Sequence, residues 1–163
     1  MVHDYKKTGV LAPKDLEEII PPSERFKKGP VAIVECVQEI PCDACVQACP
    51  QKFISKKNLV ALPKLDFDKC SGCAICVGKC PGLAIFIVDK CKAPKGKAWI
   101  TIPYEFLPVP KVGDVVRALN REGKDVGSAK VVKVVRLSKE EKTALVTFEV
   151  DEELAMEARA LRR

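Results

Sequence analysis

The sequence has no apolar run close to the roughly 18 residues that a membrane-spanning helix needs. Its start, MVHDYKKTGVLAPKDLEEII, also lacks the apolar core of a secretory signal. Histidine occurs once, as His3, so no serine or cysteine nucleophile has an evident histidine base. Neither a G-x-G-x-x-G dinucleotide loop nor a P-loop is present. These absences predict a cytoplasmic chain without a catalytic constellation of its own.

Aromatic residues are scarce, at 6% of the sequence. The 28 lysines and arginines exceed the 22 acidic residues and give a net charge of +6, but they are interspersed with acids along the chain. Nucleic-acid binding usually shows a clustered basic surface, with aromatic side chains for stacking in single-strand binders. The charge pattern therefore predicts no nucleic-acid partner.

Cysteine is abundant but confined to one part of the chain. All nine cysteines lie between Cys36 and Cys91. Without a secretion signal, metal binding is a better interpretation of such a cluster than disulfides. This distribution divides the chain into an N-terminal leader at 1–30, a cysteine-rich domain at 31–91 and a further domain at 98–163, after the linker KAPKGK.

The second cysteine motif has the complete C-x2-C-x2-C-x3-C spacing and is followed by Pro81. It contains Cys70, Cys73, Cys76 and Cys80. This is the bacterial iron–sulfur spacing, in which the fourth cysteine binds the other cluster of a pair. A structural zinc site more often uses two separated cysteine pairs, so zinc binding is the weaker hypothesis.

The first motif repeats the second at an offset of 31 residues, because CDACVQACPQKFI (42–54) aligns with CAICVGKCPGLAI (73–85). Exchange of the fourth cysteine then predicts two [4Fe-4S] clusters. Cluster 1 is assigned to Cys36, Cys42, Cys45 and Cys80, and cluster 2 to Cys70, Cys73, Cys76 and Cys49. Cys36 stands three residues further upstream than the pattern requires. Two alternatives stay open: Glu39 supplies an oxygen ligand, or the first site holds a three-iron cluster or none.

The segments around the cysteines predict an α+β protein. Residues 13–20 of the leader indicate a short helix beginning at Pro13, and the leader either packs on its own protein or lies over a partner. The stretches VAIVECV and AIFIV predict strands beside the cysteine loops. Beyond the linker, GDVVRAL, VGSAKVVKVVRL and TALVTFEV predict the strands of a small β-barrel or sheet. Acids at the front and arginines at the back of DEELAMEARALRR predict a C-terminal helix.

Residues 31–89 resemble the two-cluster bacterial ferredoxin, on the motifs CDACVQACP and CSGCAICVGKCPG. Over most of its length, the chain is also similar to the small two-[4Fe-4S] ferredoxin-like subunit of anaerobic multi-subunit flavin dehydrogenases, of the glycerol-3-phosphate or amino-acid oxidase type. That resemblance rests on VECVQEIPCDACVQACP, KLDFDKCSGCAICVGKCPGLAIF, YEFLPVPKVGDVVRALNREGKDVG and DEELAMEAR. It implies a FAD-dependent dehydrogenase subunit and an NAD-linked flavoprotein as partners, with FAD or FMN bound by those partners only.

The predicted function is a non-catalytic electron-transfer subunit that relays single electrons between flavin centres of such a dehydrogenase. The alternative is a free, diffusible two-cluster ferredoxin. Lys69 and Lys79 flank the second motif and are candidates for raising the potential of its cluster. Cys91 has no place in either motif and is interpreted as a free thiol.

Overall fold

The computed structural model describes residues 5–139 and 142–162. His3, the first four residues of the leader and Arg163 lie outside the described residues. Among the described residues, no helix is long and apolar enough to cross a membrane.

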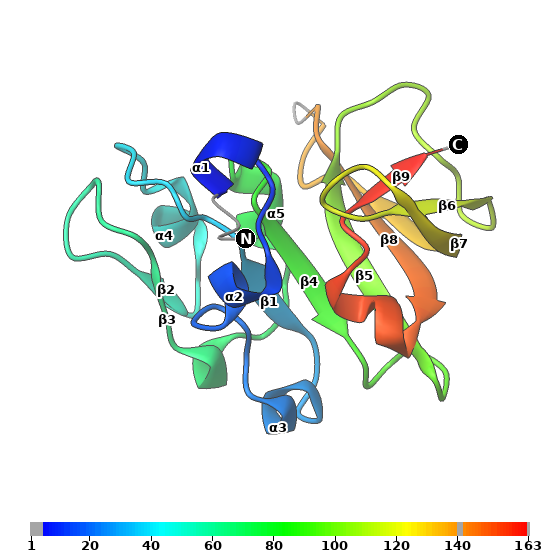
Figure 1. Ribbon diagram of the computed structural model, residues 1–163, viewed down its shortest axis with the longest axis horizontal. Helices are drawn as coiled ribbons and strands as arrows, with labels where there is room; N and C mark the ends of the chain where they lie inside the picture. Colours follow the sequence, from blue (N-terminus) through cyan, green and yellow to red (C-terminus); the bar gives the residue numbers. More distant parts are fainter. Residues whose placement is uncertain (1–4, 140–141, 163) are drawn as a thin grey trace.

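The leader forms three short helices, α1 (Tyr5–Thr8), α2 (Pro13–Leu16) and α3 (Ser23–Phe26). The helix predicted at Pro13 is present, but it ends at Leu16. Leu16 and Phe26 are buried, and Phe26 packs in one apolar cluster with Val31 and Val88 of the cysteine-rich region. The leader therefore packs on its own chain, along the cysteine-rich half of the molecule (Figure 1).

The cysteine-rich region consists of short elements on either side of two loops. They are β1 (Val31–Val34), α4 (Ala44–Ala48), β2 (Ile54–Ser55), β3 (Lys64–Leu65), the 3-10 helix η1 (Phe67–Lys69), α5 (Ile75–Lys79) and β4 (Ile85–Asp89). The strands β2 and β3 form a separate antiparallel pair. The strands predicted near 31–37 and 84–88 are present as β1 and β4, which pair with each other.

The C-terminal region contains β5 (Lys97–Tyr104), β6 (Val115–Leu119), β7 (Asp125–Val135), β8 (Ala144–Asp151), the 3-10 helix η2 (Glu152–Met156) and β9 (Ala160–Arg162). The predicted strands correspond to β6, β7 and β8. Pro103 lies within β5, where a missing N–H would disrupt a central strand. The structure accommodates it because β4 pairs with β5 only at residues 99–101, so β5 beyond that point has β8 as its recorded neighbour.

One seven-stranded sheet joins the two predicted domains. Its order is β1-β4-β5-β8-β7-β6-β9, and its recorded pairings are antiparallel. Figure 1 shows the cysteine-rich half at the left and β5–β9 at the right, with β4 leading from one to the other. Leu145 of β8 packs into the apolar cluster beneath the cysteine loops, together with Val77 and Ile85. The two halves therefore share both a sheet and a core.

The predicted C-terminal helix is wrong. Residues 152–156 form the 3-10 helix η2, and Ala160–Arg162 form β9, which pairs with β6. The charge distribution of this segment suits a helix, but tertiary contacts override such weak preferences. The edge of β6 offers unpaired backbone groups to β9, and the extended segment buries Leu161 in the core of the C-terminal half.

A buried ion triad joins this segment to the cysteine-rich region. The Glu35 carboxylate accepts hydrogen bonds from Arg121 at 2.6 and 2.9 Å and from Arg159 Nε at 2.7 Å. The Glu35 side chain is 6% exposed and that of Arg159 is 4% exposed. Burial alone would raise the pKa of Glu35, but the hydrogen bond from Arg121 and the charge of Arg159 together lower it below its ordinary value. Glu35 immediately precedes Cys36, so the triad anchors the chain where the first cysteine motif begins.

Candidate metal centre

The sequence repeat recurs in the structure with the same offset of 31 residues. Helix α4 begins at Ala44 and α5 at Ile75, in each case two residues after the first cysteine of the aligned motif. After each motif's proline, the equivalent residues Lys52 and Leu83 both have a φ of 52°. The two cysteine loops therefore have matching local geometry as well as matching sequence.

Strand pairing exchanges the two halves of the repeat. Val34, before the first motif, pairs with Ile85, after the second. At the offset of 31 residues, Val34 corresponds to Leu65 and Ile85 corresponds to Ile54. Leu65 and Ile54 also pair with each other. Each motif's leading strand thus lies beside the trailing strand of the other motif. This pseudo-twofold arrangement carries the fourth cysteine of each motif toward the other loop.

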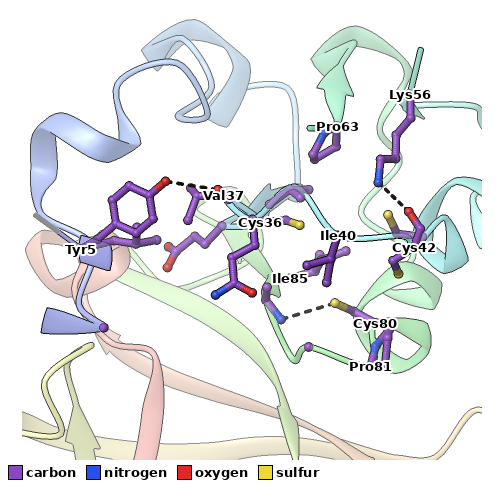
Figure 2. A pocket seen from close by; sticks show the side chains of 18 residues that line it. Tyr5, Cys36, Val37, Ile40, Cys42, Lys56, Pro63, Cys80, Pro81 and Ile85 are labelled. Atoms are coloured by element: carbon purple, nitrogen blue, oxygen red, sulfur yellow. Dashed lines mark hydrogen bonds between the residues drawn. The ribbon is translucent and has the colours of Figure 1, made fainter. Parts of the chain in front are cut away.

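Four cysteines predicted for cluster 1 line one cavity of about 330 Å³. They are Cys36, Cys42, Cys45 and Cys80. Figure 2 shows Cys36, Cys42 and Cys80 around this cavity, with Ile40 and Tyr5 also at its wall. Tyr5 donates a hydrogen bond to the carbonyl of Val37 at 3.3 Å, so helix α1 of the leader covers one side. Glu39 is exposed and does not line this cavity, which favours Cys36 over Glu39 as the fourth ligand.

The other four predicted ligands line a second, narrower hollow. They are Cys49, Cys70, Cys73 and Cys76. Cys76 is buried, whereas Cys73 is exposed and marks the outer side of this group. Among residues 5–139 and 142–162, no three His, Cys, Asp or Glu side chains gather as ligands of a single metal ion. The thiols instead surround two hollows, one for each predicted cluster.

One thiol in each group has a strongly raised pKa. Burial, and then the neighbouring Cys80, Cys36 and Cys42, raise the pKa of Cys45 to about 11. For Cys76, burial followed by the cysteines of its own group raises the pKa to about 12. Metal sites bind the thiolate form, and binding of the metal releases the proton. Deprotonation of these crowded thiols therefore requires a cation that balances the thiolate charge, and soft thiolate donors suit iron–sulfur clusters.

Backbone N–H groups point at sulfur in each half of the repeat. Phe53 N donates to Cys49 Sγ at 3.3 Å, and the equivalent Ala84 N donates to Cys80 Sγ at 3.4 Å. Cys70 Sγ accepts from Ala32 N at 3.4 Å. Hydrogen bonds to ligand sulfur stabilise the thiolate and help set cluster potentials. The donor set and its surroundings therefore fit two iron–sulfur clusters.

Gly72 allows the second cysteine loop to pass close to Pro30. Its φ is +67°, and a Cβ at this position would lie 2.5 Å from Pro30 Cβ and 2.9 Å from the Pro30 carbonyl oxygen. Gly78 has a different role, because a Cβ there would meet Leu137 at 2.6 Å. Gly72 therefore serves the cysteine loop, whereas Gly78 serves packing against the C-terminal half.

We expect Gly72→Ala to weaken the second group of cysteines selectively, since left-handed backbone strain alone costs about 1–3 kcal/mol and the clash with Pro30 adds to it. Iron content measured after anaerobic purification should fall, with faster loss of iron to a chelator. Gly82→Ala is the matched control, because nothing lies within 4 Å of its Cβ position and its φ is not positive. Equal iron retention by both variants would contradict this account.

Several residues near the cysteines escaped the sequence analysis. Arg25 of α3 donates a hydrogen bond to the Cys70 carbonyl at 2.6 Å, and Lys56 donates one to the Cys42 carbonyl at 2.5 Å. Lys69, predicted from its place beside Cys70, is instead an exposed side chain paired with Asp66 at 2.8 Å. The only sequence signal for the first two is their separation, which equals the repeat offset.

Cys91 lies apart from both groups of cysteines. Its Sγ contacts the carbonyl oxygens of Phe26 and Lys27 at 3.1 and 3.2 Å, and the residue is exposed. The interpretation of Cys91 as a free thiol outside the clusters stays a prediction.

Comparison with known proteins gives two matches. Residues 63–86 match the family of 4Fe-4S binding domains. Over 46 residues, the chain is 41% identical to the pyruvate synthase subunit PorD of Methanothermobacter marburgensis strain Marburg. That alignment covers 28% of this chain and 51% of the relative, so the chain spans about half the length of the curated relative it matches. No solved structure matches significantly.

These matches show that the chain carries a 4Fe-4S binding domain and support an iron–sulfur electron-transfer role. They also correct the partner prediction. The matching protein is a subunit of pyruvate synthase, which contradicts the expected FAD-dependent dehydrogenase subunit and NAD-linked flavoprotein.

Proposed function

We propose that this protein is a two-cluster, ferredoxin-like electron-transfer subunit of a pyruvate synthase or a similar enzyme. The observation that carries the electron-transfer part is the division of eight cysteines into two groups of four, each built from both motifs. The pseudo-twofold pairing of β1 with β4 and of β2 with β3 supports a two-cluster ferredoxin-like arrangement for residues 31–91.

The residues of this chain would hold and shield the clusters. Cluster 1 would bind Cys36, Cys42, Cys45 and Cys80, and cluster 2 would bind Cys49, Cys70, Cys73 and Cys76. When bound, [4Fe-4S] clusters supply one-electron transfer at a potential set by charge, hydrogen bonding and solvent exposure. The leader excludes water from one side of the first site through Tyr5 and Leu11. The exposed Cys73 leaves the second site closer to solvent, where a redox partner can approach.

The role as a subunit is supported by the similarity to PorD and by the surface of the C-terminal half. Phe106 and Leu107, just after β5, are 72% and 86% exposed, and Val112 and the first residue of β6, Val115, are also exposed. Apolar side chains gathered at a surface often mark a contact with another protein. An enzyme subunit that docks through this segment accounts for the added domain better than free diffusion does.

The test is anaerobic affinity purification of the native protein, with iron, acid-labile sulfide and co-purifying subunits measured together. We expect about eight irons per chain and co-purification with the subunits of a 2-oxoacid-oxidising enzyme. About eight irons on a chain that purifies alone would favour the diffusible ferredoxin. About four irons would contradict the cluster at the Cys36 site, and no iron would overturn the proposed function.

A further inference from the structure

Two basic side chains, one in α3 and one just after β2, each donate a hydrogen bond to the main chain of a predicted cluster ligand. Arg25 and Lys56 are 31 residues apart, the same offset that relates the cysteine motifs. Arg25 Nη2 donates to the Cys70 carbonyl at 2.6 Å, and Lys56 Nζ donates to the Cys42 carbonyl at 2.5 Å. Figure 2 shows the Lys56 ammonium directed at Cys42 beside the first cavity. Each cysteine loop thus has one cation held against its main chain.

The environment of Arg25 is unusual for a charged residue. It is 6% exposed, although arginine is seldom fully buried without a charged partner. Its recorded hydrogen bonds all go to main-chain carbonyls: Phe67 at 2.7 Å, Gly29 at 3.0 Å, Pro30 at 3.1 Å and Cys70 at 2.6 Å. The positive charge of Arg25 also reaches Asp68, an exposed carboxylate that is bonded to Lys28 at 2.9 Å. Carbonyl dipoles hold the guanidinium in place without cancelling its charge.

Lys56 holds its loop in a similar way but nearer to solvent. Besides the Cys42 carbonyl, its ammonium donates to the Leu59 carbonyl at 2.9 Å. The residue is half-buried, so water screens its charge more than that of Arg25. Neighbouring Lys57 is exposed, with no interaction recorded within the described part of the chain.

We propose that Arg25 and Lys56 are positioning residues that raise the reduction potentials of cluster 2 and cluster 1, respectively. This inference rests on the proposed function. Reduction adds one electron to a cluster and increases its negative charge, so a fixed nearby cation stabilises the reduced form more than the oxidised form. Because Arg25 is the more deeply buried of the two, its effect on cluster 2 exceeds that of Lys56 on cluster 1.

The experiment is an anaerobic redox titration of the full chain, followed by electron paramagnetic resonance, which resolves the two reduced clusters. Arg25→Gln should shift one potential to a more negative value, and Lys56→Gln should shift the other by a smaller amount. Arg25→Lys should retain most of the wild-type potential. Lys57→Gln removes the same charge beside Lys56 and should leave both potentials unchanged.

A purely structural role for these side chains gives a different result. In that case Arg25→Gln and Lys56→Gln lower the melting temperature but leave both potentials at the wild-type values, and the proposal is wrong. It is also wrong if both variants shift the same potential. If Arg25→Gln cannot retain its iron, the test rests on Lys56→Gln. Unchanged potentials in that variant would show that the proposal is wrong. Absence of iron from the wild-type protein would instead refute the proposed function itself.

Discussion

Replacing Cys49 with serine is expected to remove the cluster that the second motif holds, although Cys49 belongs to the first motif. Cys49 lines the hollow formed by Cys70, Cys73 and Cys76, and strand pairing brings it there. A serine hydroxyl is a poor substitute for a soft thiolate ligand. Iron should fall to roughly half of the wild-type content. One electron paramagnetic resonance signal should be lost, together with electron transfer through the assembled protein.

Two further variants make this test specific to the exchange of ligands. Cys80→Ser should remove the other cluster, because Cys80 lines the cavity with Cys36, Cys42 and Cys45. Cys91→Ser should retain both clusters, since Cys91 lies outside the two groups. If Cys49→Ser and Cys80→Ser abolish the same resonance signal, the proposed assignment of ligands cannot stand.

The second large effect is expected at Glu35. Glu35→Gln should destabilise the protein by about 3–5 kcal/mol, because it leaves the charges of Arg121 and Arg159 buried without their carboxylate. Thermal unfolding followed by far-ultraviolet circular dichroism at neutral pH measures this loss. Glu24→Gln is the control, since Glu24 forms an exposed pair with Lys27 and its loss should change stability little.

The same carboxylate predicts how stability depends on pH. The folded state lowers the pKa of Glu35 below its ordinary value of 4.5, so the contribution of Glu35 to stability is complete above that value. That contribution is lost as the pH falls through the lower, folded pKa. The stability difference between wild type and Glu35→Gln should therefore shrink on acidification below the unfolded value. A constant difference from neutral pH to well below pH 4 would contradict the ion triad as its cause.

Spacing and periodicity predicted the features that leave a regular pattern in the sequence. The motif spacing, with exchange of the fourth cysteine, predicted which cysteines line the same cavity, and β-branched stretches predicted β6, β7 and β8. Two features remained hidden because they depend on single distant residues that belong to no recognisable spacing motif. Arg25 lies 45 residues from Cys70, and Arg159 lies 124 residues from Glu35. Composition gives no signal for such contacts, and the C-terminal strand was missed for the same reason.

The separation between Glu35 and Arg159 also has a consequence for biosynthesis. A ribosome releases Glu35 and all nine cysteines well before Arg159 leaves the exit tunnel. Throughout that interval the carboxylate lacks one of its two guanidinium partners, and β6 lacks β9. Contacts between distant parts of a chain form late, and partly folded chains expose unpaired strand edges that promote aggregation. Folding of the nascent protein is therefore complete only once the segment with β9 and Arg159 has been released, and a product truncated before this segment would be the form most prone to aggregate.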